Sequence, residues 1–156
     1  MKRLFFLVLP VLLLTGCAYV TTPGTTFFTS PEIRTLDYSG QKLNSVPSDV
    51  FDKIYIENLN LSNNNLTGAI PGEIRHLQEL KILDLSNNKM TGLPAEIGQL
   101  KKLEVLNLSN NQLTGLPYEL GGLSNLKILD LSGNPYSELD LQIISKTLLN
   151  TGIVTK

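Results

Sequence analysis

The stretch LKILDLSNNKMTGLPAEIGQLKK, residues 80–102, determines how the rest of the chain is organised. It is followed directly by LEVLNLSNNQLTGLPYELGGLSN, residues 103–125, which repeats it with a shift of 23 residues. Residues 56–79 form another copy that is one residue longer, residues 126–136 begin a further copy, and residues 33–55 form a degenerate one. A fixed period of this length indicates a solenoid in which each unit buries its apolar residues against its neighbours.

Each unit carries the pattern L-x-x-L-x-L-x-x-N-x-L. Within it, apolar and polar residues alternate in Leu83-Asp84-Leu85, which predicts a strand with one buried face. The pattern resembles that of the leucine-rich repeat family over residues 31–136. The resemblance implies an α/β solenoid with a short parallel β-sheet on its concave face. It also implies irregular, 3-10 or short helical segments on the convex side and a C-terminal capping helix.

One polar position of each unit is occupied by a side-chain amide. An amide both donates and accepts hydrogen bonds, so it can satisfy backbone groups that a turn leaves unpaired inside the stack. This structural asparagine ladder is predicted to consist of Gln41, Asn64, Asn88, Asn111 and Asn134. Gln41 is one methylene longer and is expected to do this less well. The glycines that follow the ladder, Gly68, Gly92 and Gly115, are expected to adopt backbone angles that other residues avoid.

Residues 137–156 are predicted to cap the C-terminal end of the stack. Ser137 is a suitable N-cap, with an acidic residue three positions later. Leu141, Ile144 and Leu148 then lie on one helical face. Residues 153–155 follow one repeat length after Leu129 and are predicted to add a last strand.

The N-terminus carries a basic pair, Lys2 and Arg3, and an apolar run over residues 4–14 that is too short to span a bilayer as a helix. Leu14-Thr15-Gly16-Cys17 then resembles the lipobox of bacterial lipoproteins. This resemblance implies a signal peptide over residues 1–16 and lipidation of Cys17. Residues 17–30 are interpreted as a lipid-anchored tether and N-terminal cap. The alternatives are an ordinary signal peptide or a chance cysteine.

The expected location is therefore the bacterial cell envelope, and the outer membrane if the source has two membranes, because Ala18 follows the cysteine. Three sequons, at Asn60, Asn65 and Asn107, leave a small secreted plant protein as an alternative source, against which the lipobox argues. Cys17 is the single cysteine, so no intrachain disulfide can form.

The net charge and the absence of catalytic motifs in the sequence exclude several classes of function. Loss of Lys2 and Arg3 with the signal peptide takes the formal net charge from −1 to −3, which gives no reason to expect a nucleic-acid partner. We find no paired acid and base, metal-ligand cluster or phosphate loop in the sequence. The protein is therefore predicted not to be an enzyme and to need no cofactor or metal.

Two columns of the predicted sheet bear on binding. Asp37, Asn60, Asp84, Asn107 and Asp130 fall at one repeat position, where alternation of Asp with Asn keeps the carboxylates about two strand spacings apart. This column is a solvated face with little repulsion, a ligand strip, or a calcium site. Ile82, Val105 and Ile128 fall at a second position and are apolar where solvent is expected. They either pack at the strand margin or form the footprint of a partner.

The favoured prediction is a monomeric, membrane-anchored module that binds an unidentified protein or peptide on its concave face. The predicted contact residues are Ile82, Asp84, Val105, Asn107, Ile128 and Asp130. The competing surface carries Lys101, Lys102 and Tyr118 on the convex side and edge. The alternative function is a structural or adhesive envelope lipoprotein that contacts cell-wall glycan.

Overall fold

The computed structural model describes residues 19–22, 25–28, 34–148 and 151–155, which belong to two separate units, Met1–Glu32 and Ile33–Lys156. The predicted signal peptide, its cleavage point and Cys17 lie outside the described residues. In the first unit, β1 (Tyr19–Thr22) pairs antiparallel with β2 (Thr25–Phe28). Both strands lie within the predicted tether and N-terminal cap, residues 17–30, and consist of threonine, valine and aromatic residues, which favour strands.

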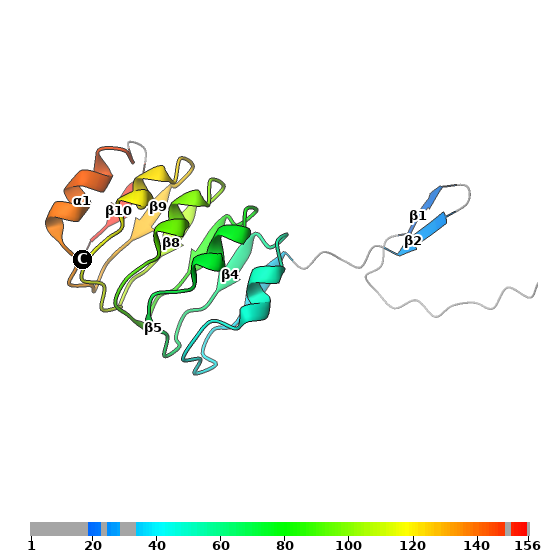
Figure 1. The fold of residues 1–156 in the computed structure, drawn as a ribbon, viewed down its shortest axis with the longest axis horizontal. Helices are drawn as coiled ribbons and strands as arrows, with labels where there is room; N and C mark the ends of the chain where they lie inside the picture. The colour runs from blue at the N-terminus through cyan, green and yellow to red at the C-terminus, as the bar shows by residue number, and fades with distance from the viewer. Residues whose placement is uncertain (1–18, 23–24, 29–33, 149–150, 156) are drawn as a thin grey trace, which may run out of the picture. The chain divides into compact units, whose positions relative to one another are not determined.

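The second unit is a solenoid built on one six-stranded parallel sheet (Figure 1). Its strands, in sheet order, are β3 (Thr35–Asp37), β4 (Asn58–Asn60), β6 (Ile82–Asp84), β8 (Val105–Asn107), β9 (Ile128–Asp130) and β10 (Gly152–Val154). The central leucine of each strand lies beside that of the next, because the repeat length sets the register. Ile153 lies beside Leu129 in the last pair, so the predicted final strand is confirmed.

Short 3-10 helices return the chain to the sheet and stack side by side (Figure 1). They are η1 (Ser48–Asp52), η2 (Gly72–His76), η3 (Ala95–Gln99) and η4 (Tyr118–Gly122). Each begins directly after a proline, whose fixed φ sets the start of the turn. Gly98 has no side chain, and one placed there would collide with the Glu119 carbonyl where η3 meets η4. A small parallel pair, β5 (Thr67–Gly68) with β7 (Lys89–Met90), lies in the connecting segments.

The core is a row of apolar side chains that each repeat contributes at the same positions. In residues 80–102 the fully buried ones are Leu80, Leu83, Leu85, Met90, Ile97 and Leu100. Leu93 packs against this core but is only half-buried. Among the described residues, every buried side-chain nitrogen or oxygen has a hydrogen-bond partner, and no helix is long and apolar enough to cross a bilayer.

The ladder asparagines tie each repeat to the one before it. The Nδ2 of Asn88 donates to the carbonyls of Leu85 (3.0 Å) and Ser86 (3.1 Å) in its own repeat, and to that of Leu61 (3.0 Å) in the preceding repeat. Its Oδ1 accepts the backbone N–H of Leu66 (3.0 Å). The same four bonds recur at Asn64, Asn111 and Asn134.

Gln41, predicted as the first ladder member, does not join it. Its side chain is exposed and forms no hydrogen bond within the described part of the chain. A ladder amide bonds the carbonyl and N–H of the preceding repeat, and Gln41 stands in the first repeat, which has no predecessor. The N–H of Leu43, in its own repeat, is already bonded by Asn64 from the next one.

The chain leaves each strand through a residue with positive φ, one position before the ladder. These residues are Gly40, Asn63, Asn87, Asn110 and Gly133, with φ between 54° and 69°. Glycine and asparagine are the residues that tolerate this conformation best. The prediction for Gly92 and Gly115 is wrong, because neither has positive φ. Gly68 has it, at 67°, in the repeat that contains one extra residue.

The C-terminal end is closed by α1 (Glu138–Ser145), which packs on η4. The hydroxyl of Ser137 accepts the backbone N–H of Asp140 at 3.3 Å, as the N-cap prediction required. Ile144 is buried and Leu141 is half-buried, as the predicted helical face required. Leu148 is buried too, but it lies beyond the helix, which ends at Ser145.

The ladder bonds predict how stability depends on these amides. Asn88→Ala or Asn111→Ala leaves buried backbone groups unpaired in two repeats, so each should lower the free energy of unfolding by about 1–3 kcal/mol. Gln41→Ala should change it by less than about 0.5 kcal/mol, because its exposed side chain forms no hydrogen bond with any described residue. Urea denaturation followed by circular dichroism measures all three. An equal loss for the three variants would contradict this account of the ladder.

Candidate functional site

The apolar strip, Ile82, Val105 and Ile128, lies on the solvent face of the sheet, which we call the sheet face. The three residues are direct neighbours on β6, β8 and β9. Ile82 is 42% exposed, Ile128 is 45% exposed and Val105 is half-buried, so the strip is open to solvent rather than packed at a margin. Polar Asn58 of β4 and Gly152 of β10 occupy the same position on either side and bound the strip.

The second column of the sheet face, Asp84, Asn107 and Asp130 with its extension to Asp37 and Asn60, has a structural role that the sequence analysis missed. The Oδ1 atom of each accepts the backbone N–H of the serine two residues later, at 2.9 to 3.1 Å. Such side-chain turns end strands. At Asp37, hydrogen bonds from the Ser39 hydroxyl and N–H hold the pKa of the carboxyl below its ordinary value. The Asx-x-Ser spacing, present in every repeat, was the feature of the sequence that could have predicted this role.

A third column borders the strands with charges that alternate in sign: Arg34, Glu57, Lys81, Glu104 and Lys127. Glu57 forms ion pairs with Lys81 (2.9 Å) and with Arg34, and Glu104 forms one with Lys127 (2.6 Å). Hydrogen bonds from Lys81, then from Arg34, lower the pKa of the Glu57 carboxyl. These exposed pairs add little stability, but they engage Lys81 and Lys127, the cations nearest in sequence to Asp84 and Asp130.

The columns together give the sheet face an electrostatic period of two repeats. Asp occupies the second column in the first, third and fifth repeats, and neutral Asn occupies it in the second and fourth. Within the described residues, neither Asp84 nor Asp130 forms an ion pair. Asn107 lies between them and donates from Nδ2 to Asp84 Oδ2 at 3.3 Å. The face thus presents carboxylates on alternate strands beside the apolar strip.

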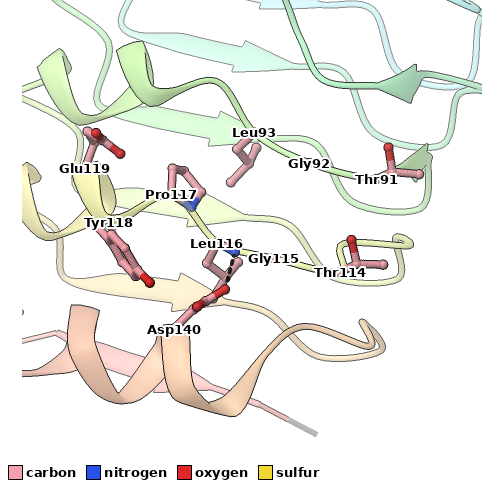
Figure 2. A pocket seen from close by; sticks show the side chains of 10 residues that line it. All are labelled: Thr91, Gly92, Leu93, Thr114, Gly115, Leu116, Pro117, Tyr118, Glu119 and Asp140. Carbon is pink, nitrogen blue, oxygen red and sulfur yellow. Dashed lines mark hydrogen bonds between the residues drawn. The ribbon is translucent and has the colours of Figure 1, made fainter.

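The competing surface contains an open hollow of about 490 Å³ between two connecting segments and α1 (Figure 2). Tyr118, 58% exposed, lies beside Asp140, whose carboxylate accepts the N–H of Leu116 at 3.1 Å. The two lysines predicted for this side are already engaged. Lys102 pairs with Glu79 (2.6 Å), and Lys101 donates to the carbonyls of Gly98 (2.8 Å) and Gly122 (2.6 Å). Across the described ranges, no three His, Cys, Asp or Glu residues lie close enough to hold a metal ion.

Comparison with known proteins gives one consistent family. Sequence profiles described as leucine rich repeat match residues 31–90, 54–113 and 78–135, and another matches residues 125–147. A leucine-rich repeat protein of Leptospira interrogans is 45% identical, with a TM-score of 0.68 over 72% of this chain. This chain covers 28% of that structure's length. Curated protein sequences give no match.

Two plant structures are also similar. The ectodomain of the receptor kinase SOBIR1 from Arabidopsis thaliana is 28% identical, with a TM-score of 0.64 over 89% of this chain and 76% of its own. The plant peptide hormone receptor RGFR1, solved in complex with RGF2, is 34% identical, with a TM-score of 0.63 over 71% of this chain and 18% of its own.

The serine N–H bonds predict different outcomes for two substitutions at one position. Asp84→Ala removes the acceptor of the Ser86 N–H. It should lower the free energy of unfolding by about 1–3 kcal/mol, because Ser86 is buried. Asp84→Asn keeps an acceptor oxygen, as in the neighbouring repeats, and should cost less than about 0.5 kcal/mol. Urea denaturation of the two variants measures this difference. Equal losses of stability in both would refute the structural role of this side chain.

Proposed function

This chain belongs to the leucine-rich repeat family, and we propose that its sheet face binds a protein or peptide while a lipid on Cys17 anchors it to a bacterial cell envelope. Proteins built from such repeats commonly use extended surfaces of the solenoid as non-catalytic binding scaffolds. The complex of RGFR1 with RGF2 is an example in which a related receptor holds a peptide hormone.

The observation that carries the binding proposal is the apolar strip beside carboxylates that form no ion pair among the described residues. Two isoleucines more than two-fifths exposed lie in register with Val105 on the sheet face. The parallel strands and the ladder fix these positions before a partner arrives, so docking costs little ordering entropy. The proposed contact residues are the strip and Asp84, Asn107 and Asp130.

The envelope location rests on the N-terminal sequence and on one relative. Cys17 follows an apolar segment in a lipobox-like tetrapeptide, and the Leptospira relative is 45% identical. Two or more acyl chains on one cysteine would anchor the protein stably, since a single chain binds membranes only marginally. If the source has two membranes, Ala18 after the cysteine favours the outer one.

A paired substitution tests the binding surface. The protein is used as bait in an envelope extract, and Val105→Arg is compared with Tyr118→Arg, which introduces an arginine in the hollow instead. Val105→Arg should abolish capture of the partner and Tyr118→Arg should preserve it. Both changes lie at the surface and should alter stability by less than about 0.5 kcal/mol. Capture that survives Val105→Arg but not Tyr118→Arg would move the site to the hollow, and retention on purified cell-wall glycan would favour the adhesive function.

The anchor has its own test. Cys17→Ser should yield an unprocessed or soluble protein, whereas the wild type should sediment with membranes and carry acyl groups on Cys17 by mass spectrometry. A wild-type protein without lipid would disprove the anchor and leave the binding proposal intact.

A further inference from the structure

Resting on the proposed function, we infer that the sheet face binds a polyproline II peptide that carries a basic residue at every third position, each followed by an apolar one. The inference comes from the spacing and charge of the two solvent-facing columns on β6, β8 and β9.

The spacing selects the conformation of the peptide. Asp84 and Asp130 lie two strands apart, on β6 and β9, which corresponds to about 9.6 Å at the usual strand separation. A polyproline II helix has three residues per turn and advances about 9.3 Å per turn. Side chains three positions apart therefore meet alternate strands of the sheet in register. In a β-strand, side chains on one face recur about every 6.7 Å, which does not match this distance.

The charges select the residue type. Asp84 and Asp130 form no ion pair among the described residues, and Lys81 and Lys127 are engaged by Glu57 and Glu104. A peptide that covered these carboxylates without supplying cations would desolvate two negative charges at a cost. Asn107, on the strand between them, is neutral and needs no cation opposite it. Lysine or arginine at positions i and i+3 is the complementary arrangement.

The apolar strip selects the residue beside each cation. Ile82 and Asp84 are two residues apart on one strand, a separation of about 6.6 Å, and the same holds in the next two strands. A peptide that runs across the strands between the two columns turns one side of its three-sided helix to the carboxylates and a second side to the strip. Its third side faces solvent and accepts any residue, proline included, because polyproline II makes no internal hydrogen bonds.

The test uses two synthetic peptides of equal composition with the full-length protein. One is KVPKVPKVP, and the other, KVKVKVPPP, places its lysines two positions apart. Fluorescence anisotropy should show the first peptide binding about tenfold more tightly, the size expected for two exposed ion pairs in register. The affinity should fall as salt is added.

Variants separate register from net charge. Asp84→Asn with Asp130→Asn keeps the acceptors of the serine N–H groups and should abolish the preference for KVPKVPKVP. Glu96→Gln with Glu119→Gln, a neutralisation of the same size on the 3-10 helices η3 and η4, should retain it. Equal binding of the two peptides, an unchanged preference in the Asp84 and Asp130 double variant, or no binding of KVPKVPKVP at millimolar concentration overturns the inference. The capture experiment with Val105→Arg judges the proposed function separately.

Discussion

The solenoid depends on one interaction, the bond network of the ladder asparagine. Each turn out of the sheet leaves backbone carbonyls and an N–H inside the stack, where an unpaired group would cost about as much as a lost buried hydrogen bond. The amide of Asn111 satisfies two carbonyls of its own repeat and a carbonyl and an N–H of the preceding one. Because half of its partners belong to the neighbour, no repeat is satisfied by itself. The ladder thus makes stacking obligatory as well as favourable.

The same dependence explains why the ends of the stack differ from its middle. The first repeat has no predecessor, and Gln41 is left in solvent there. At the other end α1 covers η4, and β10 supplies the carbonyl of Val154 that accepts the N–H of Leu131 at 2.8 Å. The hydroxyl of Thr151 also donates to the Leu126 carbonyl at 2.7 Å. The last full repeat therefore finds its missing partners in a helix and strand that do not follow the repeat pattern.

Because the ladder fixes the stack, solvent-facing residues at the same repeat position form columns. The residue types in these columns can vary, and with them the ligands that the surface can bind. The core leucines must recur in every repeat, but the residue before each strand can alternate between Lys and Glu, and the strand end between Asp and Asn. The alternation at the strand end preserves the structural role of that position, since Asp and Asn both accept the serine N–H. The charge pattern of the sheet face is therefore independent of the fold that carries it.

The sequence by itself determined the solenoid, the strand of each repeat, the capping helix and the last strand, because all of these follow from periodicity and local capping. The four asparagines of the ladder also follow from the sequence, but only the tertiary structure decided which other polar residues are structural. It showed the strand-end role of Asp84, the ion pairs of Glu57, the positive φ of Asn87 and the exclusion of Gln41. The ion pairs of Glu57 and the exclusion of Gln41 from the ladder both depend on the neighbouring repeats. The sequence of a single repeat therefore does not reveal them. The roles of Asp84 and Asn87 follow from the backbone path of the turn, which the stacked repeats fix.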